Sequence, residues 1–212
     1  FDVKSLLVFY LPVLAVFTLG YRFNRQFAQT YLKSRDASAV FALGSSYSNT
    51  VLVGLPIIMA AIGEAMIGQV FMIITFHSAL LFAITFILAA RAGEQGFSWG
   101  TFTRNMVLNP VVLSISLGMI ANAVGLSLFA ALEAGLILLA KPALVCALFV
   151  LGANLSFYKI SQDWPLALCA SFLKIILLPA CVFITGKWLL VLPAQTLTML
   201  VLLSASPLGV NA

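Results

Sequence analysis

The chain has 212 residues, of which 63% are hydrophobic and only 8% are charged. Soluble domains carry roughly 25% charged residues, so eleven Lys/Arg and six Asp/Glu are too few to cover a water-facing surface. This composition excludes soluble, disordered and collagen-like proteins and predicts an all-α polytopic membrane protein. The net charge of +5 then reflects basic cytoplasmic loops rather than a surface for nucleic acid.

The chain is expected to be a segment of a longer protein, because it begins at Phe1 and stops at Ala212 inside an apolar stretch. No small-residue cleavage site follows the first apolar run, which argues against a signal peptide. The three cysteines lie inside apolar runs, a placement that does not favour a disulfide framework or a metal cluster.

The sequence divides into apolar segments of the length that crosses a bilayer, about 20 residues. We expect them to be helices, because unpaired backbone groups are costly in lipid. The expected spans are Ser5–Tyr21, Ala37–Ile62, Gly68–Ala90, Met106–Leu128, Leu132–Leu155, Trp164–Leu190 and Ala194–Ala212.

The loops at residues 22–36, 91–105 and 156–163 are expected to be cytoplasmic, because Lys and Arg gather in cytoplasmic loops. The opposite side of the membrane would hold only Lys4 and Lys187. The cytoplasmic loops would hold seven basic residues, namely Arg22, Arg25, Lys33, Arg35, Arg91, Arg104 and Lys159.

Two segments carry the pattern of a broken helix, a polar run followed by glycine and proline. Proline lacks the amide that a helix needs and clashes with the carbonyl four residues back. We therefore predict two broken helices that meet at Pro56 and Pro207, although such kinks can also serve packing alone. The two runs are Ser45-Ser46-Tyr47-Ser48-Asn49-Thr50 with Gly54 and Pro56, and Ser204, Ser206, Pro207, Gly209 and Asn211.

A weak internal repeat supports an inverted arrangement. Residues 11–21, which begin Leu-Pro, resemble residues 178–188, which also begin Leu-Pro. The loop assignment gives these two stretches opposite orientations, and repeats of opposite orientation are typical of secondary transporters.

Several motifs in this order resemble the auxin efflux carrier family, which includes plant PIN-FORMED exporters and bacterial malonate-type permeases. Asn49-Thr50-x-x-x-Gly54-x-Pro56 is similar to the motif of the family's fourth helix, and Asn109-Pro110 stands where the sixth opens. Further matches are residues 147–155 (ALFVLGANL) for the seventh helix, 172–179 (FLKIILLP) for the eighth and 206–212 (SPLGVNA) for the ninth.

The resemblance implies ten helices in two inverted five-helix repeats, with the fourth and ninth helices crossing at their prolines. Residues 1–90 would hold helices three to five, 91–105 a cytoplasmic linker, and 106–212 helices six to nine. A sodium/bile-acid-symporter-like bundle is the alternative architecture. The substrate-binding positions that the resemblance implies are Asn49, Thr50, Gly54, Pro56, Ser206, Pro207 and Asn211.

Three further polar residues are candidates for a charge or proton role. Lys141 lies near the centre of its segment, where a charge is costly and suggests function, although snorkelling to the membrane surface or an ion pair is the alternative. Lys174 could neutralise an anion in transit or tie helices together by binding a carbonyl. His77, the only histidine, could carry a proton because imidazole titrates near neutral pH, or it could be a packed core residue.

These features predict a secondary active transporter of a small organic anion, such as a dicarboxylate or an auxin-like weak acid, in the plasma membrane. A non-transporting receptor on the same fold is the competing function. No nucleophile elbow, zinc motif or Walker loop occurs, so we expect neither an enzyme nor a cofactor. The expected partners are the anion, a coupling ion (H+ or Na+), the bilayer and a second copy of the chain.

Overall fold

The computed structural model describes residues 3–27, 37–92, 104, 108, 110–155 and 164–209. All regular structure in this part of the chain is helical, which confirms the predicted fold class. The longer helices are α1 (Val3–Phe27), α2 (Ala37–Ser46), α3 (Leu55–Ala61), α4 (Ile67–Ala92), α6 (Pro110–Ala123), α7 (Ala130–Leu155), α8 (Trp164–Phe172), α9 (Leu178–Ile184) and α10 (Ala194–Ala205).

Three short turns of π-helix interrupt these helices. The first, η2 (Thr50–Gly54), leads directly into α3, and η4 (Leu173–Leu177) joins α8 to α9. The third, η5 (Thr185–Leu189), ends α9. A 3₁₀ turn, η3 (Glu64–Met66), precedes α4. Wide π turns of this kind occur often at functional sites, and η2 and η4 both belong to the site described below.

The chain forms two compact units, one of residues 1–97 with 162–212 and one of residues 98–161. In the smaller unit, α6 begins at Pro110, where the missing amide is one that a helix start leaves unbonded in any case. Helix α7 continues through Pro142 without a break. Asn109, which was expected at the start of this unit's first helix, lies outside the described residues.

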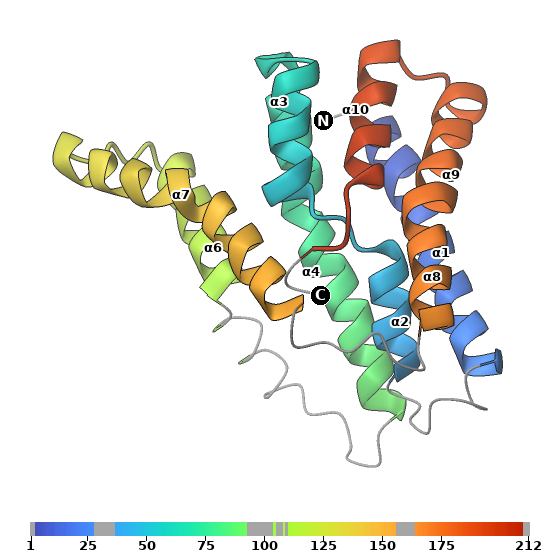
Figure 1. Cartoon of the computed structure of the whole chain (residues 1–212). Helices are drawn as coiled ribbons and strands as arrows, with labels where there is room; N and C mark the ends of the chain where they lie inside the picture. Colours follow the sequence, from blue (N-terminus) through green and yellow to red (C-terminus); the bar gives the residue numbers. More distant parts are fainter. Residues whose placement is uncertain are drawn as a thin grey trace. The chain divides into compact units, whose positions relative to one another are not determined.

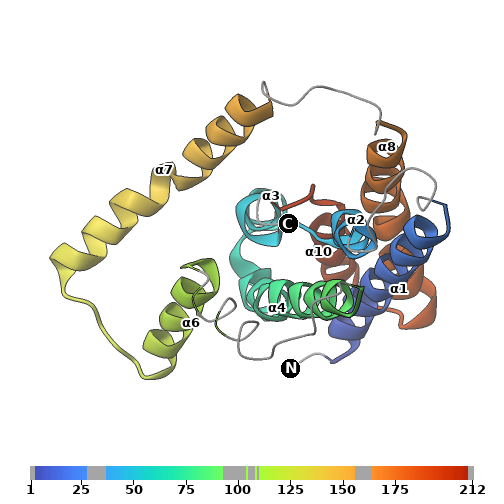
Figure 2. The same ribbon diagram turned by 90° about the horizontal axis from the view of Figure 1, so that it is seen from below.

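The larger unit is a bundle in which α2 and α10 occupy the middle, with α1, α4 and α8 around them (Figure 2). Helix α1 packs closely on α2 because Gly20 has no side chain, and a Cβ there would collide with the hydroxyl of Ser45. The fully buried side chains come from helices at both ends of the sequence; the largest are Phe9, Ile58, Ile73, Leu81, Leu178, Met199, Leu200 and Leu203.

Three of the helical stretches in the described residues are long and apolar enough to cross a membrane: Val3–Gln26, Glu64–Ala89 and Trp164–Leu189. Their outer faces carry large exposed apolar side chains such as Phe71, Ile176 and Trp188. In water such a surface would drive aggregation, whereas lipid tails are its natural surroundings. The first span is longer than expected, because α1 continues past Tyr21 to Phe27.

Candidate functional site

The predicted break in the second span is present, and it lies within the polar run. Helix α2 ends at Ser46, and Tyr47, Ser48 and Asn49 are not helical. The hydroxyls of Ser45 and Ser46 donate to the carbonyl of Ala42 at 3.0 and 2.7 Å. Serine side chains thus satisfy part of the backbone where the helix stops, as membrane-embedded chains require.

The position of the break differs from the prediction, which placed it at Pro56. Pro56 lies in the first turn of α3, beyond the break, and its side chain is exposed. The π turn η2 directly precedes it, with the amide of Gly54 donating to the carbonyl of Asn49, five residues back, at 2.9 Å. The wider turn relieves the clash between a proline ring and the preceding carbonyls. Pro56 therefore widens the helix and does not break it.

The second break follows α10. Its last residue is Ala205, and Ser206 turns the chain out of the helix with φ −57° and ψ 139°. The Ser206 hydroxyl donates to the carbonyl of Leu202 at 3.1 Å and so caps the helix end. Pro207 follows immediately, and its preference for an extended preceding residue explains why the helix stops here.

The two broken helices cross where these non-helical segments meet (Figure 1). The amide of Asn49 donates to the carbonyl of Pro207 at 2.8 Å, and the hydroxyl of Ser48 donates to the carbonyl of Ser204 at 3.4 Å. Gly54 permits the close approach, since a Cβ there would lie 2.8 Å from Cδ2 of Leu203. We call this junction, formed by Tyr47–Asn49 and Ser204–Pro207, the crossing.

A buried cation lies at the crossing. Lys174, in η4, is only 2% exposed, and its Nζ donates to the hydroxyl of Ser48 at 2.8 Å and to the carbonyl of Ser204. The only carboxylates in the described residues are Glu64 and Glu133. Both are exposed, and the bonds of the Lys174 ammonium go to a hydroxyl and a carbonyl. The ammonium is thus held by neutral oxygen atoms of both broken helices.

A histidine also supports the first break. The amide of Ser48 donates to Nε2 of His77 at 3.0 Å, and the imidazole stacks on the ring of Tyr47 with centroids 5.1 Å apart. Nδ1 of His77 is buried without a hydrogen-bond partner among the described residues. The Tyr47 hydroxyl bonds Ser78 at 2.8 Å, and Gly209 packs on the same tyrosine ring. His77 therefore fixes the non-helical backbone.

A family model described as membrane transport protein matches residues 97–212. The chain belongs to this family, that of the auxin efflux carriers. The resemblance inferred from the sequence motifs is thereby confirmed, and the protein is a membrane transporter. The matched region of the carrier includes Ser204 and Pro207, on the second side of the crossing, and Lys174, which bonds both sides. No curated protein and no solved structure matched the chain.

The crossing brings together most, but not all, of the positions proposed for this carrier. Asn49 and Ser206 are buried in the crossing, Thr50 and Gly54 are buried next to it in η2, and the carbonyl of Pro207 takes part through its bond from Asn49. Asn211 lies outside the described residues. Lys141 is exposed on α7 in the smaller unit.

Three residues in or next to the carrier's crossing belong to the runs that mark the breaks but were not predicted as substrate-binding positions: Ser48, Ser204 and Gly209. Ser48 lies inside the polar run that marked the first break, and Ser204 begins the Ser-Ala-Ser-Pro stretch that marked the second. Those runs were a usable signal for both serines. Gly209 matters through its contact with Tyr47, which the sequence gave no means of locating.

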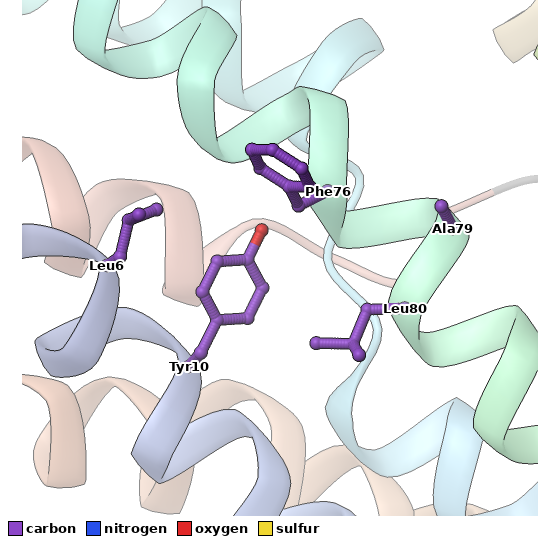
Figure 3. A pocket seen from close by; sticks show the side chains of 5 residues that line it. All are labelled: Leu6, Tyr10, Phe76, Ala79 and Leu80. Carbon is purple, nitrogen blue, oxygen red and sulfur yellow. The ribbon is translucent and has the colours of Figure 1, made fainter. Parts of the chain in front are cut away.

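The carrier also has an apolar pocket of about 630 Å³ between α1 and α4. Leu6 and Tyr10 of α1 face Phe76, Ala79 and Leu80 of α4 across it (Figure 3). The Tyr10 hydroxyl already donates to the carbonyl of Ile73 at 2.8 Å. The lining therefore offers apolar contact and no cationic group, so this pocket is unsuited to holding an anion.

Proposed function

We propose that this protein is a secondary active transporter that carries a small organic anion, such as a dicarboxylate or an auxin-like weak acid, by alternating access. Two facts support the proposal: the chain belongs to a family of membrane transporters, and two broken helices cross inside its larger unit. Broken helices that cross inside the membrane are where secondary transporters bind substrates and coupling ions.

Positive charge at the crossing is the observation that favours an anionic substrate. The half-helix that begins at Thr50 starts there, and the first turn of a helix presents unbonded amides and a positive dipole end. The buried ammonium of Lys174 adds a full positive charge at the same place. An anionic substrate placed beside these groups would be stabilised, whereas the ammonium of Lys174 would repel a cationic substrate placed beside it.

The amide side chains of Asn49 and Asn211 are proposed to complete the site. A neutral amide can donate to a carboxylate, yet it leaves no unpaired charge in the membrane when the site is empty. Binding by amides and helix ends is weaker than binding by a direct salt bridge with several charges. Such moderate binding suits a carrier, because the anion must leave on the other side.

Alternating access would use the crossing as its pivot. The bond from Asn49 to Pro207 links the main chains of the two helices, so the flanking helices could rock while the bound anion stays at the centre. We place the protein in the plasma membrane with the loops 22–36, 91–105 and 156–163 in the cytoplasm. Energy would come from an ion gradient or the membrane potential, since the sequence has no Walker motif.

The proposal is tested by uptake of a labelled dicarboxylate and a labelled indole weak acid into proteoliposomes that hold the whole protein. We expect uptake of one of these anions, and we expect Asn49→Ala to reduce it at least tenfold with an unchanged thermal unfolding midpoint. Thr198→Ala is the matched control, because Thr198 is an exposed polar residue of α10 that bonds only its own helix.

Two outcomes would contradict the proposal. Binding of an anion without any uptake would indicate the competing function, a receptor built on the carrier fold. A loss of thermal stability in Asn49→Ala with unchanged anion affinity would show that Asn49 serves only the backbone around the break. Uptake that also requires sodium would favour a mechanism like that of the sodium/bile-acid symporters.

A further inference from the structure

The ammonium of Lys174 lies at the carboxyl end of α10 and beside the non-helical segment that follows α2. Ser48, which accepts from Nζ at 2.8 Å, comes two residues after the end of α2. Ser204, whose carbonyl also accepts from Nζ, belongs to the last turn of α10. The Ser48 hydroxyl approaches the same carbonyl oxygen at 3.4 Å. A hydroxyl and a main-chain carbonyl, one from each broken helix, thus accept from the ammonium.

These oxygen atoms suit either of two cations, an ammonium group or a small metal ion. The carboxyl end of a helix bears a partial negative charge of roughly half an elementary charge, and here the last turn of α10 presents the carbonyl of Ser204 to the ammonium. Unwound carbonyls and half-helix carboxyl ends are the groups that hold a coupling sodium ion in transporters with broken helices. In the described residues, this place is filled by a side chain of the protein itself.

The local structure explains how a lysine reaches this place. In the π turn η4, the consecutive residues Leu173 and Lys174 are both buried, whereas Ile175 and Ile176 are exposed. Burial of an uncompensated ammonium would be costly, and its partners supply the compensation. Because each partner belongs to a different broken helix, the lysine both occupies the site and joins the helices.

We propose that Lys174 is a built-in substitute for a coupling sodium ion, so that the crossing is complete without Na+. This inference rests on the proposed transport function for its consequence, which is transport independent of sodium. Its structural part does not depend on transport. Removal of the side chain should leave a set of oxygen atoms that a small monovalent cation can occupy.

The test compares thermal unfolding midpoints of the purified whole protein in sodium chloride and in choline chloride at equal ionic strength. We expect the same midpoint in both salts for the wild type and for Lys187→Ala. Lys187 is the matched control, since it is an exposed lysine near the end of the same span. Its Nζ lies 5.1 Å from the centroid of the Phe183 ring. Lys174→Ala should unfold at a lower temperature in choline and show a saturable rise of several degrees with sodium.

Two results would overturn the inference: a wild-type midpoint that rises specifically with sodium, or a Lys174→Ala variant that is stable and insensitive to sodium. Where Lys174→Ala does not fold in either salt, wild-type uptake decides, because equal rates in sodium and choline support the inference and dependence on sodium overturns it. Absence of uptake in every salt would contradict the transport proposal alone. The wild-type midpoints in the two salts would then decide whether Lys174 takes the place of a bound sodium ion.

Discussion

The ammonium of Lys174 donates to the hydroxyl of Ser48 at 2.8 Å, across 126 positions of sequence. This bond connects the span of α8 and α9 to the non-helical segment between α2 and α3. Lys174 also holds the carbonyl of Ser204, on the other broken helix. One side chain therefore joins three separate parts of the bundle, and the position of the crossing depends on it.

Gly54 should tolerate no side chain. In Gly54→Ala, the new Cβ would lie 2.8 Å from Cδ2 of Leu203 and 3.2 Å from the hydroxyl of Ser206. Leu203 is fully buried and has little room to move, so we expect a loss of about 1–3 kcal/mol in stability, as for other overpacked sites. Thermal unfolding of the purified protein measures this loss.

Gly44→Ala is the matched control, because a Cβ on Gly44 would meet nothing within 4 Å. Gly44 lies inside α2, where alanine is favoured over glycine by up to about 1 kcal/mol. The two substitutions should therefore move the midpoint in opposite directions. Equal effects would show that the close approach of the two broken helices at Gly54 does not matter for stability.

The sequence predicted that two helices are broken, but it misplaced the first break by several residues. Proline and glycine next to a polar run signal that a regular helix is interrupted, which was correct for both spans. The sequence does not reveal that η2 makes room for Pro56, because a π turn depends on how neighbouring helices hold the backbone. The break instead falls at Tyr47–Asn49, where partners from other helices satisfy the chain.

The hydrogen-bond partners of the buried polar residues could not be predicted from the sequence for a related reason. Lys174 could be predicted to neutralise an anion or to tie helices together. The choice between these two roles depends on which groups surround its side chain. Its bonds to Ser48 and Ser204 span 126 and 30 residues, and no local pattern encodes contacts at such separations. The same holds for His77, whose partner Ser48 lies on another helix span.

Tyr47 should contribute more through its ring than through its hydroxyl. Tyr47→Phe removes the 2.8 Å hydrogen bond to Ser78 but keeps the stacking on His77, so a cost of about 0.5–1.5 kcal/mol is expected. Tyr47→Ala also removes the contacts with Phe82 and Gly209, and a loss of about 3–5 kcal/mol is expected for a buried aromatic residue.

Phe149→Ala serves as the control for removal of an aromatic ring, because Phe149 is 76% exposed on α7. Its midpoint should remain near that of the wild type. A Tyr47→Phe variant as unstable as Tyr47→Ala would assign the main contribution to the hydroxyl and would contradict this prediction.

His77 should act as an acceptor for the backbone and should not carry the coupled proton. Its Nε2 accepts the amide of Ser48 at 3.0 Å, and a proton added to that nitrogen would remove the acceptor. In His77→Phe the Ser48 amide would be left buried and unpaired, at a cost of about 1–3 kcal/mol. His77→Gln places a carbonyl oxygen near the position of Nε2 and should recover most of this stability.

Both variants should keep the wild-type response to an imposed pH gradient, measured as uptake into proteoliposomes per unit of folded protein. A His77→Gln variant that is as stable as the wild type, yet no longer responds to the gradient, would identify His77 as the proton carrier instead.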